Sequence, residues 1–179
     1  MRQDSASPPS RLVVGRDHLL MTDPTANRRV LKQAAALVKV DFSPQDRQPS
    51  PVRVALALVA SIFGSLAVDA FVVAVGTAIF PATKGYTHFR FPDYAKLTVI
   101  GVIIAVAAWP IVTRVTSAPR WLFLRLAVLV TVVLWLPDVY ILYRGQPGDA
   151  VAVLMVMHVA IAVVTYNALV RIAPPQPIG

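Results

Sequence analysis

The chain has 179 residues, of which 56% are apolar and only 15% charged, and its formal net charge is +8. This composition is abnormal for a soluble domain of this size and excludes an ordinary soluble globular protein. The absence of cysteine excludes disulfides, thiolate metal sites and thiol nucleophiles. The basic residues are scattered among Asp and Pro without interleaved aromatic residues, which argues against a nucleic-acid binder and favours the anionic inner face of a membrane as partner.

Residues 1–50 form a basic, proline-containing segment, which we predict to be a mostly disordered cytoplasmic tail. The tail has no apolar stretch long enough for the core of a signal peptide. Asp23 and Pro24 have the pattern of a helix cap and a first helical position, and residues 24–40 have an apolar and a basic face. This segment is either an amphipathic helix on the inner leaflet or a short, partly formed helix. Met21 opens the capped segment, so residues 1–20 are either a translated part of the tail or an overextended gene start, and both interpretations stay open.

Residues 51–172 contain four long apolar runs, which predict helices over about 54–80, 95–115, 121–143 and 150–171. Each run has at least about the 17 to 25 residues that a helix needs to cross a hydrocarbon core of roughly 30 Å. The expected fold class is therefore all-α, an integral membrane four-helix transmembrane bundle. Residues 173–179 are expected to form a short C-terminal tail.

The flanking positive charges predict the orientation of these helices, because Lys and Arg accumulate in cytoplasmic segments close to helix ends. The bias predicts a multi-pass protein of the bacterial cytoplasmic (inner) membrane with cytoplasmic N- and C-termini. The exported loop at 81–94 is rich in aromatic residues, which indicates anchoring at the headgroup boundary or a cover over the outer mouth of the bundle. The residues expected inside are Lys39, Arg47, Arg53, Arg114, Arg120 and Arg171, and those expected outside are Lys84, Arg90, Lys96 and Arg144.

Polar residues inside the spans mark the positions where polarity is most costly. Ser61, Ser65 and Asp69 recur every four residues, so they form one stripe of the first helix that should face other helices. A charged Asp69 facing lipid would cost several kcal/mol. Pro110 and Pro137 each remove a backbone donor inside a span and predict helix kinks.

Asp69, Asp138 and His158, with Ser65 beside them, form our candidate polar intramembrane cluster. In the predicted topology the three ionisable groups lie roughly 8 to 16 Å from the outer helix ends, at a rise of about 1.5 Å per residue. They could share protons, bind a cation or hold a polar headgroup. The alternative is a structural role, in which His158 donates to one Asp, Ser65 completes the bonds and the cluster holds the helices together.

Motifs for catalysis are absent from the sequence. It contains no glycine-rich phosphate loop, no HExxH, no GxSxG and no EF-hand spacing, so we predict no enzyme, no cofactor and no metal site. Zinc binding by two Asp and one His is chemically permissible, but spacing along the chain does not establish it. Arg125, one turn into the third span, is expected to reach back to the inner surface or to pair with an acid.

The segments Leu136-Pro137-Asp138 and 154–159 (LMVMHV) resemble an uncharacterised family of four-helix membrane proteins from actinobacteria, a domain of unknown function. The resemblance covers about residues 50–172 and leaves the basic tail outside. It implies that the Pro-Asp of the third helix and the Met-His of the fourth belong to one recurrent core. The family brings no established activity with it.

These observations favour an accessory or assembly subunit of a larger membrane complex. Four short-looped helices leave little room for a solvated path in one protomer, and small residues on helix faces suit packing against neighbours. The expected partners are the lipid bilayer and a membrane protein or a second copy of the chain, and no nucleic acid. The alternative is a small carrier or lipid-binding membrane protein that uses the Asp/His cluster, and a membrane enzyme ranks third.

Overall fold

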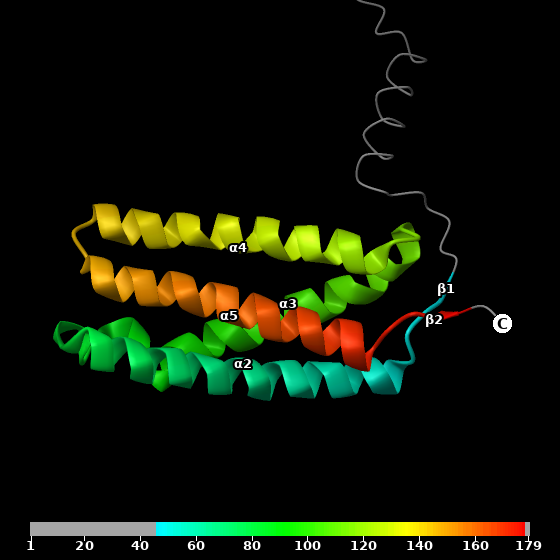
Figure 1. The fold of residues 1–179 in the computed structure, drawn as a ribbon, viewed down its shortest axis with the longest axis horizontal. Helices are drawn as coiled ribbons and strands as arrows, with labels where there is room; N and C mark the ends of the chain where they lie inside the picture. Colours follow the sequence, from blue (N-terminus) through cyan, green and yellow to red (C-terminus); the bar gives the residue numbers. More distant parts are fainter. Residues whose placement is uncertain (1–45, 178–179) are drawn as a thin grey trace, which may run out of the picture. The chain divides into compact units, whose positions relative to one another are not determined.

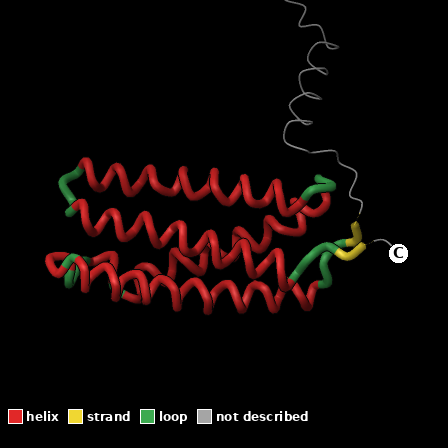
Figure 2. The backbone as a smooth tube through the Cα atoms, in the orientation of Figure 1, coloured by secondary structure: helices red, strands yellow, loops and turns green. Residues whose placement is uncertain are grey.

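The computed structural model describes residues 46–177, so the tail helix predicted at 24–40 lies outside the described residues. Four long α-helices dominate the fold: α2 (Pro51–Ile79), α3 (Phe91–Val115), α4 (Pro119–Tyr143) and α5 (Gly148–Ile172) (Figures 1 and 2). All four are long and apolar enough to cross a membrane, which confirms the all-α transmembrane fold class. The short elements are the 3-10 turns η1 (Pro81–Thr83) and η2 (Thr87–Phe89) and the two-residue strands β1 (Asp46–Arg47) and β2 (Gln176–Pro177).

The helices begin two to four residues before the starts predicted from the apolar runs. Pro51, Pro92 and Pro119 stand in the first turns of α2, α3 and α4, where a missing N–H costs nothing. Ser50 caps α2, because its side chain accepts a hydrogen bond from the backbone N–H of Arg53 at 3.3 Å. Hydropathy misses these first turns because they are partly polar. Pro110 lies within α3, and α4 likewise continues past its own proline to Tyr143.

Successive helices run antiparallel, and α5 lies at the centre of the bundle, where it packs most extensively against α2 and next against α4 (Figure 1). Two glycines of α2 allow this close approach. A Cβ atom on Gly76 would come within 2.6 Å of Val153 Cγ2, and one on Gly64 within 2.9 Å of Val164 Cγ1. Only glycine fits at these contacts without a shift of α5.

The start of α2 and the end of α5 lie at one end of the bundle, which we call the terminal end (Figure 1). The opposite end, with the connections 80–90 and 144–147, is the loop end. At the terminal end β1 pairs antiparallel with β2, and the Thr113 hydroxyl donates to Gln48 Oε1 at 2.8 Å. Residues 46–50 and 173–177, which the sequence analysis assigned to the tails, therefore pack onto the bundle.

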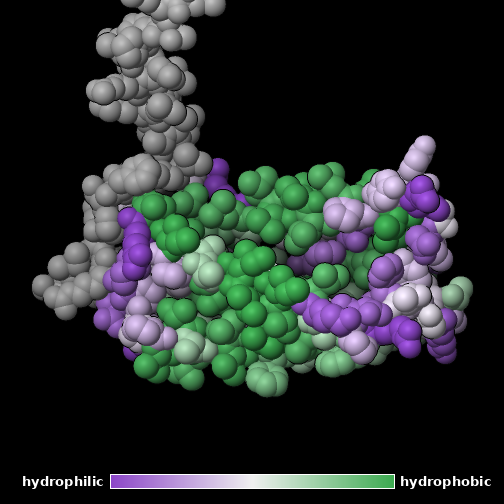
Figure 3. Space-filling model, turned by 180° about the vertical axis from the view of Figure 1, so that it is seen from behind, coloured by the Kyte–Doolittle hydropathy of each residue, from purple (hydrophilic) through white to green (hydrophobic). Residues whose placement is uncertain are grey.

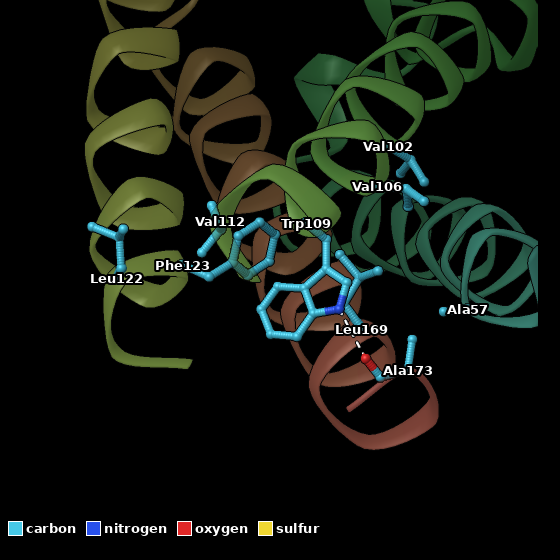
Figure 4. Packing of buried hydrophobic residues seen from close by; sticks show 9 residues of the cluster. All are labelled: Ala57, Val102, Val106, Trp109, Val112, Leu122, Phe123, Leu169 and Ala173. Carbon is cyan, nitrogen blue, oxygen red and sulfur yellow. Dashed lines mark hydrogen bonds between the residues drawn. The ribbon is translucent and has the colours of Figure 1, made fainter. Parts of the chain in front are cut away.

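An apolar core fills the terminal half of the bundle (Figure 4). Trp109 is fully buried at its centre, and its indole Nε1–H donates to the carbonyl of Ala173 at 2.8 Å. The ring of Phe123 meets Trp109 edge-on with centroids 5.0 Å apart, and it stacks on Tyr166 from the other side. The buried members of this core are Ala57, Val102, Val106, Trp109, Val112, Leu122, Phe123, Leu169 and Ala173.

The outer surface of the bundle carries a broad apolar belt between two hydrophilic ends (Figure 3). Large apolar side chains such as Phe63, Ile104 and Leu129 are more than half exposed on different helices. Exposed apolar side chains on this scale suit contact with lipid tails rather than with water. The protein is therefore a multi-pass membrane protein.

A candidate polar site in the loop half of the bundle

The three predicted ionisable residues all lie in the loop half. Asp138 is five residues before the end of α4, and Asp69 and His158 are each ten residues from the loop ends of α2 and α5. At about 1.5 Å per residue these positions are roughly 8 to 15 Å inside the helix ends. Their depth agrees with the predicted one, and it places the cluster within the apolar belt.

Asp69 is completely buried, and it contacts α3 rather than His158. Its Oδ2 atom accepts a hydrogen bond of 2.7 Å from the hydroxyl of Thr98, a residue that the sequence analysis did not select. The other oxygen, Oδ1, is buried without a hydrogen-bond partner among the described residues. Burying a carboxylate oxygen without a hydrogen-bond donor costs free energy, so the burial of Asp69 lowers the stability of the bundle.

Asp138 and His158 form the second polar contact, which joins α4 to α5. His158 Nδ1 lies 3.2 Å from Asp138 Oδ2 and 3.0 Å from the carbonyl oxygen of Leu154. Because a carbonyl oxygen can only accept, we assign a proton to Nδ1. That N–H points to Leu154, so Asp138 Oδ2 contacts the ring without hydrogen-bond geometry. The His158 side chain is 27% exposed.

The two contacts belong to one electrostatic cluster. The charge of His158 acts on Asp138 directly and also on Asp69. The structure brings two of the three selected residues, Asp138 and His158, into contact, while Asp69 lies against Thr98 of α3. A charge on the imidazole changes the free energy of charging either carboxyl group.

Ser65, the fourth predicted member, makes no hydrogen bond in the described chain. Its Oγ atom and that of Ser61 are fully buried between the helices, and the Thr165 hydroxyl on α5 is buried without a partner as well. Ser65 therefore does not complete the bonds of the Asp and His groups, although the contact of His158 with Asp138, the other part of the structural alternative, is present. These hydroxyl groups instead continue the polar stripe of α2 from Asp69 toward the terminal half.

The connection between α2 and α3 lies beside Asp138. The charges of His88 and Asp138 interact, and the Tyr86 ring meets His88 and Phe89 edge-on at centroid distances of 5.2 and 5.1 Å. The Tyr86 hydroxyl is buried without a partner, and burial, helped by the negative charge of Asp138, raises its pKa. It therefore stays protonated near neutral pH and keeps a hydrogen-bond donor beside the cluster.

The sequence analysis missed Thr98, Tyr86 and His88 as members of this region. Thr98 interrupts an apolar run, as many Thr residues of membrane helices do, so its position alone carries little signal. Tyr86 and His88 were interpreted mainly as interfacial anchors because the whole loop is aromatic. Only the fold shows that the loop lies beside Asp138.

The cluster does not have the geometry of a metal centre. Across residues 46–177, no three His, Asp or Glu side chains lie close enough together to hold a metal ion. Two carboxyl groups, one imidazole and several hydroxyls suit proton exchange or hydrogen bonding to a small polar group instead.

Comparison with known proteins assigns the chain to a family. No curated protein and no solved structure matches the chain. A family model described as a family of unknown function, DUF6069, matches residues 30–174. This match extends further than the predicted resemblance, which began near residue 50, and so includes part of the basic tail. Because it covers most of the sequence, the chain belongs to the DUF6069 family of unknown function.

Proposed function

We propose that this protein is a small membrane carrier in which proton binding at Asp69 and at the Asp138–His158 pair is coupled to the binding of a small polar solute or headgroup. The observation that carries the proposal is the unpartnered Oδ1 atom of the fully buried Asp69, at membrane depth, within electrostatic reach of an imidazole. A proton, a cation or a hydrogen-bond donor at this atom removes the cost of leaving it unpaired.

Access to the cluster supports the same proposal. His88 is exposed at the loop end and interacts electrostatically with Asp138. His158 is partly exposed and Asp69 is not. The imidazoles are therefore more exposed than the buried carboxyl groups on which their charges act, which suits proton exchange with the aqueous phase.

The same contacts also join helices, α2 to α3 through Asp69 and Thr98 and α4 to α5 through Asp138 and His158. A purely structural role predicts that loss of these groups lowers the amount of folded protein. A carrier role predicts that they can be neutralised with folding intact. The two roles therefore differ in a measurable quantity.

The experiment compares proton flux and folded protein in the same samples. Asp69→Asn, Asp138→Asn and His158→Ala are reconstituted into vesicles that contain a pH-sensitive dye, and protein recovery is measured by size-exclusion chromatography. Asp149→Asn is the matched control, because Asp149 is an exposed carboxylate at the loop end outside the cluster. We expect the three cluster variants to lose flux at normal recovery. Normal flux in all three, or loss only together with loss of folded protein, contradicts the carrier.

We keep an accessory or assembly subunit as the second candidate, because one observation favours it. α4 packs mainly on α5, and apolar residues such as Val128, Val132 and Leu136 on its remaining surface are half or more exposed. A partner helix or a second copy could cover this surface. Purification in a mild detergent followed by mass spectrometry tests the idea, since a stoichiometric membrane protein partner would support it and recovery of the monomer alone would oppose it.

We also propose the predicted location, a bacterial cytoplasmic membrane with the terminal end inside, and the actinobacterial source stays a prediction. The chain has no cysteine, so labelling with a membrane-impermeant maleimide has no background. A single cysteine at Gln146 of the loop end should react in intact cells, and one at Ser117, between α3 and α4, should react only after lysis. The reverse pattern would overturn the orientation.

A further inference from the structure

Exposed arginines gather at the terminal end of the bundle. Each of the four helices contributes at least one, at the start of α2 and α4 and at the end of α3 and α5. Along the described chain the loop end carries a different mixture, in which acidic residues accompany the basic ones and Lys96 pairs with Asp93 at 3.8 Å. The exposed arginines of the terminal end are Arg53, Arg114, Arg120, Arg125 and Arg171.

Acidic residues are scarce at the terminal end of the described chain, where Asp46 of β1 is the one present and is followed by Arg47. The carboxylates of residues 48–177 are Asp69, Asp93, Asp138 and Asp149, and all four lie in the loop half. The ion pairs in the described chain likewise involve only loop-half residues. Among the described residues this excess of guanidinium ions at one end of an apolar belt produces a local positive potential.

Side-chain contacts fix the positions of these arginines best at the start of α4, which lies beside the end of α5. The Arg125 guanidinium lies 3.7 Å from the centroid of the Trp121 ring, so its side chain turns back along α4 toward Arg120. The Tyr166 hydroxyl donates to the Arg120 carbonyl at 3.4 Å, which brings α5 alongside, and Arg171 lies further along α5 toward the same end. A tryptophan with adjacent arginines at the edge of an apolar belt is typical of the headgroup region.

From this arrangement we propose that Arg120, Arg125 and Arg171 bind the phosphate of an anionic phospholipid headgroup at the terminal end. The membrane itself supplies phosphate at this depth, and guanidinium groups bind its oxygens in pairs through parallel N–H donors. The inference does not depend on the proposed carrier function, because it uses none of the residues of the polar cluster.

The experiment measures lipid preference directly. The full chain is placed in nanodiscs of equal parts phosphatidylcholine and phosphatidylglycerol, and the lipids retained after release are counted by native mass spectrometry. The test variant combines Arg120→Gln, Arg125→Gln and Arg171→Gln. The control combines Lys84→Gln, Arg90→Gln and Arg144→Gln, which removes the same charge from exposed loop-end residues.

We expect wild type and control to retain phosphatidylglycerol preferentially. Each arginine near an anionic surface contributes about a factor of five in affinity, so the test variant should lose the preference by about a hundredfold. Equal loss in the control would show a general charge effect, and an unchanged preference in the test variant would place the lipid elsewhere. Either result overturns the proposal, as does retention of an acidic protein in place of lipid.

A variant that fails to fold is covered by a second comparison. Arg120→Gln with Arg171→Gln leaves Arg125 on Trp121 intact, and the same two positions changed to Lys keep the charge but lose the paired donors. We expect the Gln pair to lose the preference and the Lys pair to keep only part of it. Identical retention by wild type and the Gln pair would contradict the proposed site.

Discussion

The two halves of the bundle differ in the side chains that they bury. The terminal half has an aromatic and aliphatic core around Trp109, whose one polar atom has a hydrogen-bond partner. The loop half buries two carboxyl groups, each with an oxygen that has no hydrogen-bond partner in the described chain, whereas the unpartnered atoms nearer the terminal end are the hydroxyls of Ser61, Ser65 and Thr165. Because an unpaired carboxyl oxygen costs more free energy than an unpaired hydroxyl, we expect the terminal half to contribute more to stability than the loop half.

Among the variants that test this difference between the halves, we expect the largest effect on the free energy of unfolding at Trp109. Trp109→Ala leaves a cavity and an unpaired carbonyl at Ala173, so we expect the free energy of unfolding to fall by about 3 to 5 kcal/mol. Detergent-denaturation curves measure this. Trp109→Phe is the control, because it keeps most of the packing and should cost clearly less. If Trp109→Ala lowers the free energy of unfolding less than the loop-half polar variants do, the terminal half is not the half that contributes more to stability.

The glycine contacts between α2 and α5 give the next largest effect. Gly76→Ala puts a Cβ atom against Val153, and we expect a loss of about 1 to 3 kcal/mol. Gly101→Ala is the matched control, since nothing lies within 4 Å of its added Cβ and it should be neutral or slightly stabilising. Adding Val153→Ala to Gly76→Ala should restore part of the loss. If Gly76→Ala and Gly101→Ala change the free energy of unfolding equally, the close contact with Val153 does not require glycine at position 76.

Loss of the Asp138–His158 contact should affect stability less. Interhelical polar contacts in membranes average about 0.6 kcal/mol, so we expect a coupling of this size from the cycle of Asp138→Asn, His158→Ala and the double variant. Unfolding curves of the wild type and the three variants at one pH supply the numbers. A coupling near that of Trp109→Ala would make the contact structural, and the carrier proposal would then lose its support.

The smallest effect is expected for Tyr86→Phe near neutral pH. The hydroxyl has no partner, so its removal should be neutral or slightly stabilising. Since the folded state raises the pKa of Tyr86, the unfolded chain releases the phenolic proton first as pH increases. The wild type therefore loses stability above about pH 10, whereas the variant does not. Parallel alkaline unfolding curves would show whether that difference exists.

The sequence was sufficient for the fold class because a membrane helix has a simple signature. Four apolar runs predicted four spans, and the period of Ser61, Ser65 and Asp69 identified the buried face of α2. The boundaries were less accurate, because the first turns contain proline and polar residues. The packing of residues 46–50 and 173–177 could not be predicted, because strand pairing and the Trp109 bond to Ala173 join residues far apart in the chain.

For the candidate site, the sequence identified the ionisable residues but not their contacts. Charge inside a span is conspicuous in any apolar run, so Asp69, Asp138 and His158 could be selected one by one. Which helix faces which carboxylate is decided by the fold. Asp69 therefore meets Thr98 instead of His158, and Ser65 remains without a partner.

The dominance of the α2–α5 contact has a consequence for biosynthesis. The first of the four spanning helices to be synthesised, α2, packs mainly against the last, α5, so its main neighbour does not exist until translation is nearly complete. Thr98 of α3 is available to Asp69 earlier, but until α5 is made the side of α2 that faces it needs some other protein surface as its neighbour, such as that of the insertion machinery. A nascent chain stalled before Gly148 should therefore remain associated with that machinery, and synthesis of α5 should release it.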